Sequence, residues 1–348
     1  MIRTIAIALS LTLAAAAGTA KPEPLPVDPV VLVEHDEHRA GEPGITAEHE
    51  GRVYRFVNEA SREVFRANPA RYAVRLGGSC ARMGPFSGEG RVDLYAAIDG
   101  RVYLFASESC RETFLEHHDR LLESDDPAIE PSPESAAAAA EVLARAVRYA
   151  TGGKGINTFA GFEIVRLRQV ESGGNDYEHE VRTRYGLRRL LLEHSERWNE
   201  RVWRRAWAGD RGTVSDPDGS ARAMVSDQID ACRREALRHP LAMLASFERG
   251  DAVAESVGQA GAGDGVRVHA GGVTMDLVVD DAGAIVSSAC RDRASSMMIG
   301  TVERRYLGST TTGGLRVPTD YEVTVDGERV PGMDRRGLEA EASPPEAG

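Results

Sequence analysis

The side chains best suited to chemistry in this chain are four cysteines and a few histidines. The cysteines are Cys80, Cys110, Cys232 and Cys290, and His117 follows Cys110 at a spacing of about two helical turns. Thiolate and imidazole groups that converge on one point bind transition metals such as zinc. A metal site made of Cys80, Cys110 and His117 is therefore one hypothesis. The competing interpretation, which the sequence favours, is that His117 lies in solvent at a helix end, as histidines next to acidic residues commonly do.

The even number of cysteines also permits disulfides in an exported protein. Pairing Cys80 with Cys110 and Cys232 with Cys290 would keep each bridge inside one half of the chain, although four cysteines allow three pairings. The alternative is four buried free thiols, because cysteine is among the most buried residue types. The sequence leaves both interpretations open.

Export is predicted from residues 1–20. Arg3 precedes an uncharged apolar run, Ile5 to Ala17, and small residues follow it. This pattern is typical of a cleaved secretory signal peptide, so we expect a periplasmic or secreted protein. No later segment is apolar enough for a transmembrane span. The formal net charge of −12 argues against a nucleic-acid partner, whose phosphates require a basic surface.

A repeat organises the first third of the chain. Residues Gly51–Tyr72 recur at Gly100–Leu121, with ten of 22 positions identical. Each copy predicts a strand, a helix start at a polar capping residue, and a helix with one phenylalanine on its inner face. A single strand–helix unit cannot bury its apolar side alone, so we expect the two copies to pack together. The aromatic residues of the repeat are then core residues: Tyr54, Phe56, Phe65, Tyr103, Phe105 and Phe114.

This region resembles a YHS domain, most closely that of exported YHS-like proteins. The resemblance is carried by Asp28-Pro29-Val30, by the Gly-x-x-Tyr-x-Phe strand, by Asn68-Pro69-Ala70-Arg71-Tyr72 and by Gly77-Gly78-Ser79-Cys80-Ala81. YHS domains are often associated with metal binding through cysteines. This chain departs from that pattern, because Val31, Ser61 and Ala106 stand at positions where metal-linked members often have cysteine.

The remainder of the chain predicts an α+β domain, an antiparallel, strongly curved sheet with helices on one face. Helices are expected at Ala136–Ala150 and Ser220–Leu237, with alternating strands between and after them. The helix end at Gly152-Gly153 and the late Gly314–Pro318 segment resemble a LolA-like outer-membrane lipoprotein-sorting domain. That resemblance implies an incomplete β-barrel able to hold a lipoprotein acyl chain or another apolar ligand, and it assigns no individual contact residue.

Three tryptophans lie within ten residues, at Trp198, Trp203 and Trp207, and arginines alternate with them. One interpretation is a half-exposed strand on which arginine stems cover the rings. The other is that the tryptophans line a ligand cavity, since such cavities are mostly apolar and aromatic.

These observations predict a signal peptide at 1–20, a YHS-like domain at 21–123, a linker at 124–135, a LolA-like domain at 136–334 and a disordered tail at 335–348. No hydrolase elbow, zinc-protease motif, phosphate loop or dinucleotide fingerprint is present. We therefore expect a non-enzymatic binding protein without a cofactor, for a lipid or another apolar ligand. The alternatives are transition-metal handling by the YHS-like domain, and an accessory role with a protein partner.

Overall fold

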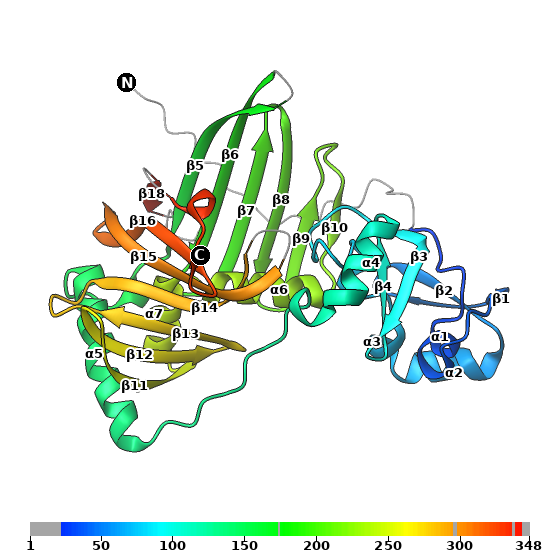
Figure 1. Cartoon of the computed structure of the whole chain (residues 1–348), viewed down its shortest axis with the longest axis horizontal. Coiled ribbons are helices and arrows are strands. Elements are labelled where there is room, and N and C mark those ends of the chain that lie inside the picture. Colours follow the sequence, from blue (N-terminus) through cyan, green and yellow to red (C-terminus); the bar gives the residue numbers. More distant parts are fainter. Residues whose placement is uncertain (1–21, 173–174, 295–297, 336–337, 343–348) are drawn as a thin grey trace.

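The computed structural model describes residues 22–172, 175–294, 298–335 and 338–342. The expected signal peptide therefore lies outside the described residues. The chain forms a front lobe, residues 22–123, and a back domain, residues 133–342, which stand side by side in Figure 1.

The front lobe contains two β-hairpins, each followed by a helix. Its elements are α1 (Pro29–His35), β1 (Glu42–His49), β2 (Arg52–Phe56), α2 (Glu59–Ala67), α3 (Pro69–Tyr72), η1 (Arg75–Gly78), β3 (Arg91–Ile98), β4 (Arg101–Phe105), α4 (Glu108–His117) and η2 (His118–Arg120).

The two sequence repeats have the same packing. Asn58 caps α2 by accepting from the Ser61 amide at 2.9 Å, and Ser107 caps α4 by accepting from the Cys110 amide at 3.2 Å. Phe65 lies 4.8 and 5.1 Å from the ring centres of the two aromatic residues of β2, and Phe114 lies 5.2 and 5.3 Å from those of β4. All six aromatic rings are buried, which confirms their prediction as core residues.

Strand β4 joins the two repeats into one lobe. Its alternate residues face opposite sides, as in any strand. Val102 and Leu104 belong to the core of the first repeat, whereas Tyr103 and Phe105 belong to the core of the second. The expected packing of one copy on the other is therefore confirmed.

Asp28, in the Asp-Pro-Val motif, has a structural role. Its buried carboxylate accepts from the amides of Val30, Val31 and Val57 and from the hydroxyl of Ser61, the last at 2.6 Å. The motif thus ties the start of α1 to the end of β2 and the start of α2.

The back domain contains two seven-stranded antiparallel sheets with helices between and beside them (Figure 1). The first sheet has the strand order β10-β9-β8-β7-β6-β5-β18, and the second has the order β11-β12-β13-β14-β15-β16-β17. The bounds are α5 (Pro133–Thr151), η3 (Ile156–Thr158), β5 (Gly161–Ser172), β6 (Asn175–Gly186), β7 (Leu191–Trp198), β8 (Arg201–Ala208), β9 (Arg211–Ser215), β10 (Ala221–Ala223), α6 (Ser226–Leu237), α7 (Pro240–Arg249), β11 (Ala252–Ala260), β12 (Gly263–Ala270), β13 (Val273–Val279), β14 (Ile285–Ala294), β15 (Met298–Thr312), β16 (Leu315–Val325), β17 (Glu328–Arg329), η4 (Pro331–Met333) and β18 (Glu339–Ala342).

Two expectations for this domain need correction. The strands divide between two sheets with open ends, so a single curved sheet or incomplete barrel is not confirmed. The prediction of a disordered tail is wrong at Glu339–Ala342, which form β18 and pair with Phe162–Val165 of β5. Small and acidic residues alternate in β18, which is only a weak sequence signal for a strand. The strand forms because β5 offers an open sheet edge with which it can pair.

The predicted linker is attached to the back domain at its start. Asp125 pairs with Arg233 and Arg234 of α6, and the Asp126 carboxylate accepts from the Thr274 amide at 2.8 Å. Ser132 then caps α5 by accepting from the Ser135 amide. These contacts fix the course of residues 124–132 between the front lobe and α5.

Candidate ligand-binding site

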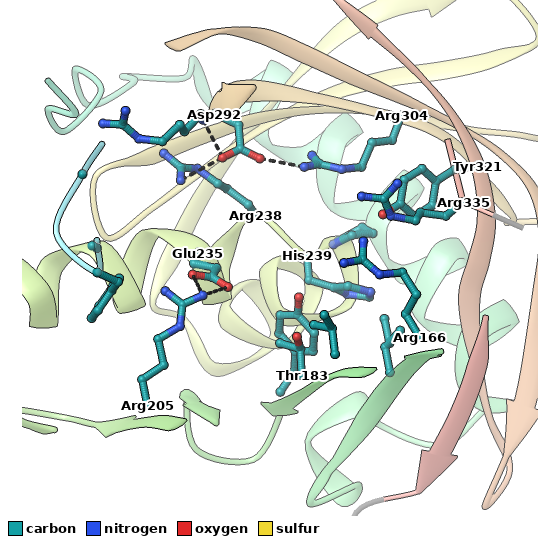
Figure 2. Close-up of a pocket in the computed structure, with 18 of the residues that line it drawn as sticks. Arg166, Thr183, Arg205, Glu235, Arg238, His239, Asp292, Arg304, Tyr321 and Arg335 are labelled. Atoms are coloured by element: carbon teal, nitrogen blue, oxygen red, sulfur yellow. Dashed lines mark hydrogen bonds and ion pairs between the residues drawn. The ribbon is translucent and has the colours of Figure 1, made fainter. Parts of the chain in front are cut away.

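A cavity of about 610 Å³ lies between the two sheets of the back domain, above α6 and the start of α7. This volume is within the range of small-molecule sites. Figure 2 shows its polar side chains converging from both sheets and from α6. The lining residues are Met83, Gly84, Pro85, Phe86, Ser87, Glu123, Ile164, Arg166, Val181, Thr183, Tyr185, Arg205, Ala231, Glu235, Arg238, His239, Pro240, Asp292, Arg293, Arg304, Tyr306, Pro318, Tyr321, Arg335 and Leu338.

Arginine is the dominant charged residue of the cavity wall. Six arginines face only three carboxylates there, so the wall carries an excess of positive charge although the whole chain is acidic. A ligand in this cavity would therefore meet charged side chains as well as apolar ones. The apolar part of the wall includes Ile164, Val181, Pro318 and Leu338.

Most of these charges are paired. Asp292 lies 3.0 Å from Arg238 and 2.6 Å from Arg304. Burial alone would raise the pKa of Asp292, but the two guanidinium groups outweigh this effect and hold the pKa below its usual value. Arg238 also contacts Glu123, at 3.3 Å.

A second pair joins the first sheet to α6. The Arg205 guanidinium lies 2.8 Å from the Glu235 carboxylate. Burial nevertheless raises the pKa of Glu235, because desolvation outweighs the attraction of Arg205. The pKa values of Glu235 and Asp292 are therefore shifted in opposite directions.

Arg166 of β5 and Arg335 after η4 differ from the other arginines of the wall. Among the described residues, neither forms an ion pair with a carboxylate, and the buried Arg166 Nε has no hydrogen-bond partner. Burial, and next the charge of Arg335, lower the pKa of Arg166 to about 10, so the group stays protonated at neutral pH. The two cations lie at the same end of the cavity (Figure 2).

His239 lies at the same end of the cavity as Arg166 and Arg335, and its neutral imidazole is a hydrogen-bond donor. Its Nδ1 accepts from the Leu241 amide at 3.2 Å and thereby caps α7. Burial lowers the pKa of His239 to about 3, and the charge of Arg304 adds to the effect. A neutral imidazole whose Nδ1 accepts must carry its proton on Nε2, so this N–H is the donor left for a ligand.

The front lobe supplies one side of the cavity. Residues Met83–Ser87 line it, and the Pro85 carbonyl accepts from Gln228 Nε2 of α6 at 2.7 Å. The guanidinium of Arg205 lies 4.5 Å from the Phe86 ring centre. A neutral hydrogen bond and a cation–π contact thus hold the front lobe against the cavity.

The three tryptophans do not act as one group. Trp207 is buried in a small core with Leu192 and Met224. Trp198 and Trp203 line a second cavity of about 330 Å³ that shares Phe86, Ser87 and Arg205 with the first. Trp198 also stacks on His179, with ring centres 3.9 Å apart. A ligand-binding role for Trp198 and Trp203 stays a prediction.

The hypothetical metal site is not formed. Among the described residues, no three histidine, cysteine or acidic side chains converge as metal ligands would. Cys80 and Cys110 belong to one core cluster, and each thiol affects the pKa of the other. His117 is half exposed beside Glu116, as the competing interpretation expects. Cys110 and His117 both belong to α4. Cys110 lies on the face of α4 that packs in the core, whereas the His117 imidazole at the end of the helix is in contact with solvent.

Of the two interpretations of the cysteines, the structure agrees with free thiols: all four cysteines lie in the described part of the chain, are buried and form no disulfide. Cys232 contacts the Met224 sulfur in one core cluster, whereas Cys290 belongs to another cluster and contacts Arg304. Burial raises the pKa of Cys80, whereas Ser107 and Arg82 outweigh burial and lower the pKa of Cys110.

Mild oxidation with diamide should join Cys80 to Cys110 and leave Cys232 and Cys290 reduced, because only the first two thiols belong to the same core cluster. Mass spectrometry of alkylated peptides measures the outcome, and Cys110→Ser serves as the control that cannot form the bond. A link between Cys232 and Cys290 in the folded protein would contradict this expectation.

Sequence reasoning missed the arginines and the histidine of the cavity. Arg166 and Arg168 alternate in β5 like residues of a solvent-facing strand, and nothing local shows that a second sheet covers Arg166. Arg335 lies where a disordered tail was expected. His239 had a usable signal, because a residue that precedes a proline at the start of an apolar run is a candidate helix cap.

Comparisons with known proteins add little to this geometry. No family model and no curated protein matches the chain. Among solved structures, a LolA superfamily protein from Nitrosomonas europaea is similar, with 13% identity and a TM-score of 0.35, over 58% of this chain and 89% of that chain. That level of likeness assigns neither fold nor function. In the part of the chain that the structure describes, no helix combines the length and apolarity that a membrane crossing requires.

Proposed function

We propose that this chain is an exported, non-enzymatic binding protein that holds a lipid-like ligand in the cavity between its two sheets. The observation that supports the proposal is the cavity itself, about 610 Å³ in volume and lined by apolar side chains next to a cluster of arginines. Such a wall suits a molecule with both an apolar and a charged part. The front lobe, a YHS-like module, completes one side of the site through Met83–Ser87.

Filling the cavity tests this proposal. Ile164 lines the cavity, whereas Leu167 on the same strand is 59% exposed. Ile164→Trp should reduce the binding of a fluorescent fatty-chain probe at least about tenfold, because the larger ring occupies the ligand volume. Leu167→Trp is the matched control and should leave binding unchanged.

Native mass spectrometry after gentle extraction gives an independent measurement. We expect the wild-type protein to retain an amphiphile and the Ile164→Trp variant to lose it. If the wild-type protein retains no such molecule and shows no saturable probe binding, the proposed function is wrong.

The exported location is part of the same proposal, and it is supported by the pattern of residues 1–20. Cell fractionation of a carboxy-terminally tagged chain tests it. The full chain should appear outside the cytoplasm at a lower mass than its translated sequence, and a variant without residues 2–20 should stay in the cytoplasm.

A further inference from the structure

We propose that the Arg166–Arg335 end of the cavity binds a phosphate monoester group, and that the ligand is an amphiphile that carries this group on an apolar chain. This inference rests on the proposed function and deepens it, since it names the chemical class of the ligand and the side chains that recognise its head.

The arginines of the cavity wall differ in whether a carboxylate compensates their charge. Arg205, Arg238 and Arg304 each have a carboxylate partner, and Arg293 lies 3.6 Å from Glu123. These four arginines share three carboxylates, so two of the three excess positive charges of the wall lie at Arg166 and Arg335. Two unpaired guanidinium groups in one partly buried site repel each other, and a bound anion would remove this cost.

Hydrogen bonds within the protein hold Arg335 in place before any ligand binds. Backbone hydrogen bonds of 3.0 and 2.9 Å join Arg335 to Tyr321 of β16. The Arg335 guanidinium also donates through Nη1 to the carbonyls of Met333 and Asp334, at 2.8 and 2.9 Å. These contacts orient Arg335, and no other described residue occupies its Nη2 and Nε, which can therefore donate to a ligand. Figure 2 shows Arg335, Tyr321, His239 and Arg166 around the same space.

The hydrogen-bond donors and the charge at this end of the cavity suit a phosphate monoester better than a carboxylate. Two guanidinium forks and the His239 Nε2–H provide more donors than the two oxygens of a carboxylate can use. A phosphate monoester offers three terminal oxygens and a charge of about −1.5 to −2 at neutral pH, which matches the two free cations. The apolar part of the ligand would lie against Ile164, Val181, Pro318 and Leu338.

The test compares dodecyl phosphate with one probe that lacks the phosphate and one that lacks the apolar chain. Wild-type protein is titrated with dodecyl phosphate, dodecanol and inorganic phosphate, all below micelle-forming concentrations. Dodecyl phosphate should bind about 10- to 100-fold more tightly than dodecanol, since each charge-assisted contact contributes substantially. Inorganic phosphate should bind much more weakly than dodecyl phosphate, because it lacks the apolar chain.

The double variant Arg166→Gln/Arg335→Gln assigns the effect to the two side chains. It should lose the preference for dodecyl phosphate and keep the affinity for dodecanol. Arg211→Gln is the control for loss of an arginine outside the cavity, because Arg211 is 89% exposed on β9, and it should behave like the wild type. Circular dichroism tests whether each variant is folded. If the double variant does not fold, the binding of the three probes to the wild-type protein decides the question alone.

The outcomes separate the two proposals. Equal binding of dodecyl phosphate and dodecanol to the wild type overturns the phosphate site and leaves the lipid-binding function standing. An unchanged preference in the double variant overturns the assignment to Arg166 and Arg335. Inorganic phosphate that binds as tightly as dodecyl phosphate identifies free phosphate as the ligand and overturns the amphiphile. Failure of every dodecyl probe to bind overturns the proposed function as well.

Discussion

Replacing Asp292 by asparagine is expected to lower the free energy of unfolding by about 3–5 kcal/mol, the range for removing one partner of a buried ion pair. Asp292 bridges Arg238, the residue that follows α6, and Arg304 of β15, at 3.0 and 2.6 Å, and its side chain is only 16% exposed. Asparagine keeps the shape but not the charge, so it would leave Arg304 without a carboxylate partner inside the cavity wall and Arg238 with Glu123 alone.

Urea unfolding followed by circular dichroism measures this difference. The matched control is Asp93→Asn, because Asp93 pairs with Arg91 at a fully exposed position, where screened pairs contribute little. We expect no measurable change for that control. A loss for Asp292→Asn no greater than for Asp93→Asn would show that the network does not hold α6 against β15.

The lowered pKa of Asp292 determines how the stability difference between the wild type and Asp292→Asn should change with pH. The pKa of Asp292 is lower in the folded protein than its usual value, so its stabilising contribution is present above about pH 4, the pKa of an unperturbed aspartate. The contribution is lost as the pH falls through the lower folded-state pKa. The stability difference between wild type and Asp292→Asn should therefore shrink in acid and stay constant from pH 5 to 8.

The elements of the front lobe were predictable because their signals are local. Repetition marks the two units, Asn58 and Ser107 are strong capping residues, and the aromatic alternation identifies the inner face of each strand. Helix α5 was equally clear from its alanine content and its end at Gly152, which has the left-handed conformation that favours glycine.

Helix α7 shows where this reasoning fails. Pro240–Ser246 are buried on every side, so no polar face interrupts the apolar run and no helical period is visible. The cavity was unpredictable for a related reason. Its walls come from β5, α6, β15 and the end of the chain, and only the tertiary pairing of two sheets brings their arginines together.

Phe65→Ala and Phe114→Ala should each lower the free energy of unfolding by about 3–5 kcal/mol, the usual cost of removing a buried phenylalanine ring. Both rings are almost completely buried, and each packs on two further aromatic rings in an equivalent place of the repeat. The neighbouring residues supply controls. Val64 and Leu115 are 44% and 49% exposed on the other faces of α2 and α4, so Val64→Ala and Leu115→Ala should change stability little.

These variants also show whether the repeats unfold together. Because β4 gives Val102 and Leu104 to the first core and Tyr103 and Phe105 to the second, neither core can open without disturbing the strand that both share. Phe65→Ala and Phe114→Ala should therefore shift one common transition of the front lobe in thermal unfolding followed by near-ultraviolet circular dichroism. Two separate transitions, each shifted by only one of the variants, would mean that the repeats are independent units despite their shared strand.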